Sequence, residues 1–213
     1  MKKLLCLSLI LVFVLSLVSC TPADKVGETV TREIDRTELL SILNAAYEKT
    51  AEQSNITYGL DYDDGVGNRK YGLYDDGKYL YAEESYGTVW LLKENDACLR
   101  FIEYQGEKRK TSSSGENFED LVTGMRNYMF NSELTDAREM VEYTDNLTCI
   151  VSTIGDMSKY SITCSIDEKN YEMEIIITSG LVERIEMFDV IVSFTYSSPA
   201  LPNFDDYPDA LKQ

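Results

Sequence analysis

Turn signals recur about every ten residues between Ile56 and Thr111, and this spacing constrains the fold more than any other feature. The runs between them are rich in Tyr, Leu and Val, a composition that favours strands. The turn signals are Asp63-Asp64-Gly65, Asp75-Asp76-Gly77-Lys78, Ser85-Tyr86-Gly87, Lys93-Glu94-Asn95-Asp96 and Gln105-Gly106. This pattern predicts an antiparallel meander. Asp76-Gly77 suits a two-residue hairpin loop, which would place Tyr74 opposite Tyr79 and Leu73 opposite Leu80.

Two amphipathic helices are predicted beside this meander. In residues 35–54, apolar side chains recur at steps of three and four, and Asp35 with Glu38 resembles a capping box. Residues 117–130 carry a second apolar stripe. Each helix has one apolar side, so each must lie against another element, for which the sheet is the natural partner.

The last third of the chain returns to strands. One hairpin is predicted from residues 147–153 and 160–166, and a second from residues 171–178 and 182–188, with Ser179-Gly180 as its turn. A last strand, residues 190–196, precedes Pro199 and Pro202, which end regular pairing.

Two cysteines fall in the first of these hairpins. If its turn centres between Asp156 and Met157, Cys149 faces Cys164. Directly opposed strand residues are close enough for a disulfide between Cys149 and Cys164 to be considered. Two buried, reduced cysteines are the alternative, and both stay open. Cys98 has no evident partner, and its apolar neighbours indicate a buried strand position.

Composition argues against several classes of function. The net charge of −17 opposes binding to phosphate backbones, so no nucleic-acid partner is expected. The chain has no histidine, which removes the commonest general base and zinc ligand. Asp61 to Gly65 does not match a calcium loop, since its glycine falls at the wrong position. We therefore expect no enzyme activity, no catalytic residues, no metal and no cofactor. A catalytic pair of carboxylates among the 37 acidic residues is the alternative that stays open.

The N-terminal residues resemble a bacterial lipoprotein signal. Lys2 and Lys3 precede an apolar run, residues 4–18, which is shorter than the roughly 20 residues of a membrane-spanning helix. Leu17-Val18-Ser19-Cys20 resembles the lipobox. The resemblance implies a signal peptide of residues 1–19, a diacylglyceryl group on Cys20, and an extracytoplasmic protein attached to a membrane. That membrane would be the cell membrane of a Gram-positive organism or the outer membrane of a Gram-negative one. Residues 20–32, polar and without periodicity, are expected to form a tether.

The order of elements resembles the LolA/LolB-type lipoprotein-carrier fold, also seen in LprG-like and LppX-like lipoproteins. The most sequence-like element is Val192-Ser193-Phe194-Thr195-Tyr196 followed by Pro199 and Pro202. The resemblance implies that residues 33–213 form one α+β domain. In it, an antiparallel, curved, half-open β-barrel carries two amphipathic helices on its concave face and encloses an apolar cavity.

Two functional hypotheses follow. The first is a membrane-anchored lipoprotein that binds a hydrophobic or lipidic ligand in a half-barrel cavity. The candidate lining residues are Trp90, Met125, Met129, Met140, Met173, Met187 and Phe194, for which simple core packing is the alternative. The second hypothesis is a non-enzymatic interaction module of the cell envelope, with a protein partner and no small ligand.

Overall fold

The computed structural model describes residues 29–62, 67–95, 97–114, 117–131, 133–166 and 168–210. Its strands form one twelve-stranded sheet in the order β1-β8-β9-β10-β11-β12-β2-β3-β4-β5-β6-β7. The strands are β1 (Val30–Ile34), β2 (Ile56–Tyr62), β3 (Arg69–Tyr74), β4 (Tyr79–Glu84), β5 (Gly87–Glu94), β6 (Ala97–Tyr104), β7 (Glu107–Ser114), β8 (Asn146–Ile154), β9 (Met157–Ile166), β10 (Lys169–Thr178), β11 (Leu181–Met187) and β12 (Val190–Thr195).

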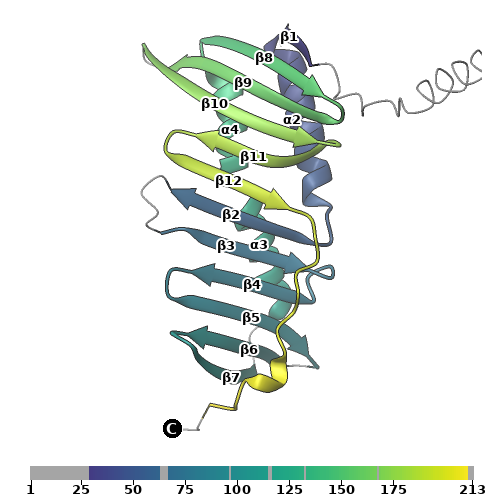
Figure 1. Cartoon of the computed structure of the whole chain (residues 1–213), viewed down its shortest axis with the longest axis vertical. Helices are drawn as coiled ribbons and strands as arrows, with labels where there is room; N and C mark the ends of the chain where they lie inside the picture. The colour runs from purple at the N-terminus through teal and green to yellow at the C-terminus, as the bar shows by residue number, and fades with distance from the viewer. Residues whose placement is uncertain are drawn as a thin grey trace, which may run out of the picture.

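Two antiparallel meanders make up this sheet. The first runs from β2 to β7 and the second from β8 to β12, and the two join where β12 pairs with β2, for example at Val192 and Leu60. The sheet does not close, because β1 and β7 lie at its opposite ends (Figure 1). The predicted α+β class with an antiparallel, curved and unclosed sheet is therefore confirmed.

The helices all lie on one side of the sheet (Figure 1). They are α2 (Arg36–Ala51), α3 (Phe118–Asn131) and α4 (Glu133–Tyr143). The prediction of two helices was thus wrong for the part of the chain that the structure describes. The missed helix, α4, buries only Leu134, Ala137 and Val141, a narrow stripe in an otherwise mostly polar segment.

The first predicted helix is confirmed as α2. The carboxylate of Asp35 accepts a hydrogen bond from the backbone N–H of Glu38 at 2.8 Å, so it caps the N-terminus as expected. Leu39, Leu43 and Ala46 are buried against the sheet and α4. The second predicted helix matches α3 to within one residue at each end.

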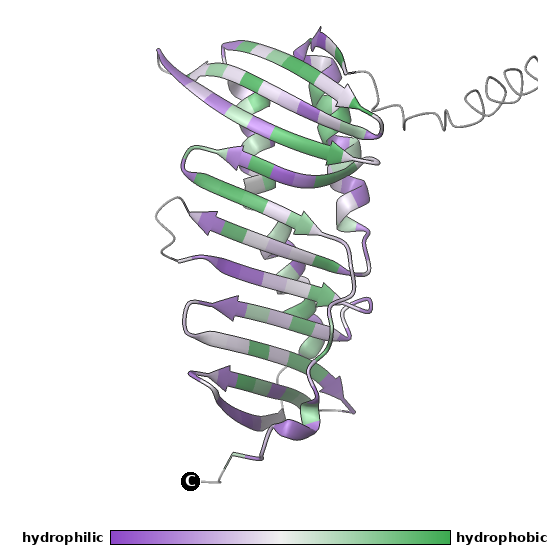
Figure 2. Ribbon diagram, viewed as in Figure 1, coloured by the Kyte–Doolittle hydropathy of each residue, from purple (hydrophilic) through white to green (hydrophobic). Residues whose placement is uncertain are grey.

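The sheet has two unlike faces. On the side covered by the helices, called the helix face here, alternate strand residues form the main core together with the apolar stripes of the helices. The opposite side is called the outer face. Across β8–β12 the outer face carries mostly polar side chains. Across β3–β6 it carries a separate aromatic cluster. The outer face is the one turned toward the viewer in Figure 2.

Hairpin registers were predicted with mixed success. Tyr74 pairs with Tyr79 and Leu73 with Leu80, as expected. In the β8–β9 hairpin, however, the turn is Gly155-Asp156 alone, with Gly155 at φ +62°. Ile154 therefore pairs with Met157, and the register differs by two residues from the predicted one.

The predicted tether, residues 20–32, overlaps the first strand. Val30, Thr31 and Arg32 belong to β1, which pairs with β8. All residues of β1 except Ile34 are exposed. The strand therefore has no buried face that would appear in the sequence as an alternation of apolar and polar residues. Residues 20–28 of the predicted tether lie outside the described residues.

Candidate hydrophobic binding site

Most of the predicted cavity-lining residues are part of the main core. Met129, Met173, Met187 and Phe194 are buried in it, and Met125 and Met140 are half-buried against it. All six side chains therefore lie between the sheet and the helices, where they take part in core packing. Core packing is the alternative that the sequence left open for them.

Trp90 is the exception among the predicted lining residues. It lies on the outer face, where its ring centroid is 4.6 Å from that of Tyr81 and 5.9 Å from that of Tyr74. The prediction that it lines the same cavity as the methionines was wrong. Both neighbours of Trp90, Val89 and Leu91, are also apolar, so alternation did not reveal which face it occupies.

The two cysteines of the β8–β9 hairpin are buried and form no disulfide with each other, and Cys98 is buried as well. Cys149 pairs with Ile162, and Cys164 pairs with Leu147. The predicted facing of Cys149 and Cys164 is therefore wrong, because the shorter turn moves them out of direct opposition. Cys20, the predicted lipid-attachment residue, lies outside the described residues.

A strip of the helix face extends beyond the main core. Ala82, Val89 and Ile102 lie side by side on β4, β5 and β6, on the same face as the core residues Leu80 and Leu91. All three are half-buried, and none belongs to the main core cluster. We call Ala82, Val89 and Ile102 the apolar strip.

A hollow of about 330 Å³ lies over the apolar strip. Besides the strip, its lining includes Tyr86, which is 71% exposed, and Tyr104, which is 45% exposed. Arg109 on β7 pairs directly with Ile102, so an exposed guanidinium stands at the β7 end of the strip. The strip therefore offers an apolar floor with tyrosines beside it, an exposed carboxylate, Glu84, in the lining of the hollow, and a cation at its β7 end.

Two tyrosines border the strip on its other side. Tyr71 on β3 pairs with Ala82 on β4. The ring of Tyr128 from α3 contacts the Tyr71 ring edge-on, with 5.0 Å between the ring centroids. The hydroxyl of Tyr71 donates a hydrogen bond to Glu84 at 3.1 Å. Burial, followed by the influence of Tyr128 and Glu84, raises the pKa of Tyr71 to about 12, so its hydroxyl is neutral and a donor at physiological pH.

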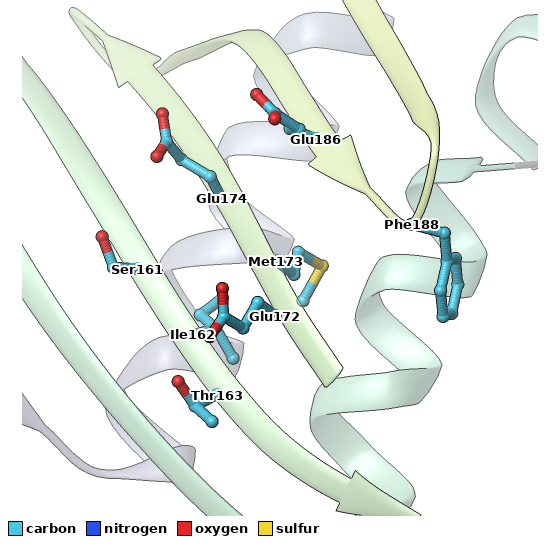
Figure 3. Close-up of a pocket in the computed structure, with 8 residues that line it drawn as sticks. All are labelled: Ser161, Ile162, Thr163, Glu172, Met173, Glu174, Glu186 and Phe188. Carbon is cyan, nitrogen blue, oxygen red and sulfur yellow. The ribbon is translucent and has the colours of Figure 1, made fainter. Parts of the chain in front are cut away.

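A second hollow, of about 430 Å³, is polar and lies on the outer face (Figure 3). Ser161, Glu174 and Glu186 project from β9, β10 and β11 at paired positions. Both carboxylates have a cationic partner: Glu174 forms an ion pair with Lys159 at 2.5 Å, and Glu186 forms one with Arg184 at 2.6 Å. Among the described residues, no group of three or more Cys, Asp or Glu is placed to hold a metal ion. This hollow has the character of a solvated sheet surface.

These features define the class of the protein as an α+β fold with an open antiparallel sheet, helices on one face, and a half-buried apolar strip. Within the described residues, no helix combines the length and apolarity needed to cross a bilayer.

Comparison with known proteins adds little to this description. A scan against protein-family models finds no match, and a search of curated proteins finds no significant relative. Among solved structures, the chain is similar to LprF from Mycobacterium bovis, at 9% sequence identity and a TM-score of 0.44. The match covers 78% of this chain and 97% of LprF. No residue role is carried over from LprF.

Proposed function

We propose that this chain is a membrane-anchored, extracytoplasmic lipoprotein that binds a hydrophobic or lipidic ligand without catalysing a reaction. The observation that carries the proposal is the apolar strip, where the helix face continues past the helices and stays half-exposed. Exposed apolar surface that continues a core is a common feature of ligand-binding grooves.

The strip is a better candidate site than the space between sheet and helices. That space is occupied by the packed methionines and Phe194. An acyl chain laid over Ala82, Val89 and Ile102 would remove their remaining apolar surface from water, at about 25 cal/mol per Å². The hollow there lies near the lower end of the usual size range for ligand pockets, about 300 Å³. Arg109 would then face a polar or anionic head group at the end of the chain.

The proposed anchor is a diacylglyceryl group on Cys20. Because β1 begins at Val30, about ten residues would separate the anchor from the sheet, a reach of at most roughly 35 Å. The proposed tether would join the sheet at β1, so the anchor would hold that end nearest the membrane. The strip, on β4–β6, lies further along the sheet (Figure 1).

A matched pair of substitutions tests the site. Ile102→Asp places a carboxylate in the apolar strip, whereas Ile150→Asp makes the same change at an exposed position of β8 on the outer face. In titrations with a fluorescent fatty acid, we expect Ile102→Asp to weaken binding by about tenfold or more, because an ionised carboxylate is costly to desolvate. Ile150→Asp should bind like the unaltered chain. Equal affinities for both variants would contradict the proposal.

The alternative function is an interaction module of the cell envelope without a small ligand. The observation that favours it is the tight packing of the predicted lining residues in the core. Native mass spectrometry of the protein, purified from a lipid-rich host, separates the two functions. A bound species in the lipid mass range supports the ligand hypothesis, whereas ligand-free protein that crosslinks reproducibly to one membrane protein supports the interaction module.

A further inference from the structure

The C-terminal segment packs across the outer face of the sheet. After β12 the chain runs in front of the strands, on the side away from the helices, and ends beside β7 (Figure 1). We call residues 203–210 the strap; it includes the short 3-10 helix η1 (Phe204–Asp206). Phe204 lies 4.4 Å from Phe101 and stacks on Tyr79 at 6.3 Å, measured between ring centroids. Tyr207, only 5% exposed, meets Phe101 edge-on at 5.5 Å.

The strap also pairs with the edge of the sheet. The backbone N–H of Lys110 donates to the carbonyl of Pro208 at 2.7 Å, and the N–H of Ala210 donates to the carbonyl of Lys110 at 2.8 Å. These two bonds form a parallel bridge between Lys110 and Asp209. The strap therefore covers part of an otherwise open edge strand.

Charge complements these contacts. The strap carries Asp205, Asp206 and Asp209, whereas β7 carries Lys108 and Lys110 on the outer face, in a chain whose net charge is −17. The ammonium of Lys108 is 4.0 Å from the carboxylate of Asp206 and 5.1 Å from the ring centroid of Tyr207. The outer face and the β7 edge thus bind a segment that is acidic and aromatic and that pairs with β7 only near Asp209.

Residues 196–203, which connect β12 to the strap, do not fix the position at which the strap docks. Residues 196–203 contain no helix or strand and are mostly exposed, and Pro199 and Pro202 keep them from pairing. A terminal segment that docks through such a connection can exchange between identical chains, since the second copy offers the same surface and the same segment.

We propose that the groove formed by Tyr79, Trp90, Phe101 and the β7 edge accepts the strap of a second copy of this chain, giving a strap-exchanged pair. The partner is specified by the surface itself: its occupant is the chain's own acidic, aromatic C-terminal sequence. The exchange makes and breaks only non-covalent contacts. It is independent of the apolar strip, which lies on the opposite face.

Isotope mixing with a zero-length crosslinker tests this exchange on the full chain. Equal amounts of ¹⁴N- and ¹⁵N-labelled protein are incubated for hours, so that local opening can occur. A carbodiimide then couples lysines to neighbouring carboxylates. At about 1 mM protein, a concentration of the order found between tethered partners, about half of the straps should dock on another copy. Since half of those copies carry the other isotope, we expect roughly a quarter of the Lys108–Asp206 crosslinked peptide to carry mixed labels. In dilute solution it should stay unmixed.

The same lysine supplies the control. Lys108 is 3.9 Å from Glu103 on β6, a neighbour within its own hairpin, so the Lys108–Glu103 crosslink should stay unmixed at every concentration. A Lys108–Asp206 crosslink that never mixes overturns the proposal. Equal mixing in both crosslinks also overturns it, because that result indicates random collision between molecules.

Discussion

The thiol of Cys149 is held neutral by its surroundings. Burial, together with the charge of Glu38, raises its pKa from 9.0 to about 11. Because thiolate is the reactive form, this cysteine should be inert at neutral pH.

The buried cysteines make a residue-scale prediction. We expect Cys98, Cys149 and Cys164 to resist alkylation in the native protein at neutral pH, and all three to be alkylated after unfolding without reductant. Peptide mapping by mass spectrometry identifies each site. Cys149 and Cys164 peptides that stay linked until a reductant is added would contradict the free thiols seen in the structure.

The raised pKa of Cys149 also predicts a pH dependence. The native state holds this proton more tightly than the unfolded state, so the associated stability is fully present below pH 9 and is lost as pH rises through 11. The free energy of unfolding, measured in urea, should therefore fall between those two pH values. A Cys149→Ala variant should show a smaller fall. An identical fall in both proteins would exclude Cys149 as the cause.

At the scale of elements, the packing of α4 predicts the effect of a core substitution. Leu134 is 2% exposed, and Leu→Ala at such a core position costs about 2–5 kcal/mol. Leu201, outside any helix or strand and 42% exposed, provides the matched control, for which we expect a change within about 0.5 kcal/mol. Urea unfolding measures both. Equal effects would mean that α4 does not pack against the sheet as described.

Elements with strong local signals could be predicted from sequence. Asp76-Gly77 and Ser179-Gly180 both marked turns correctly, and Asp35 marked the start of α2, because each depends on backbone conformation within a few residues. β1 and the pairing of β12 with β2 could not be predicted this way. Their pairing depends on contacts between segments far apart in the chain, for which the local sequence carries no signal.

The candidate site shows the same limit. β4, β5 and β6 carry apolar residues on both faces, as in Val89-Trp90-Leu91, so the strands read as covered on both sides. Which face is left open depends on where α3 and the C-terminal segment end. Strands rich in apolar residues could therefore be predicted from the sequence, but the face on which Trp90 lies was predicted wrongly.

The two meanders of the whole molecule share one core. Ile175 on β10 and Leu73 on β3 belong to the same buried cluster, which also includes residues of all three described helices. We expect a single cooperative transition in scanning calorimetry, with equal calorimetric and van't Hoff enthalpies. Two separate transitions would mean that the β12–β2 seam divides the protein into independent units.

The central claim is that the apolar strip binds a hydrophobic ligand, and photolabelling tests this claim most directly. The protein is irradiated with a diazirine-bearing fatty acid, and the labelled residues are located by peptide fragmentation. We predict labels at Ala82, Val89 and Ile102 that disappear when excess unlabelled fatty acid is added. Labels that are not displaced, or that fall equally on outer-face residues such as Ile150, would contradict the account.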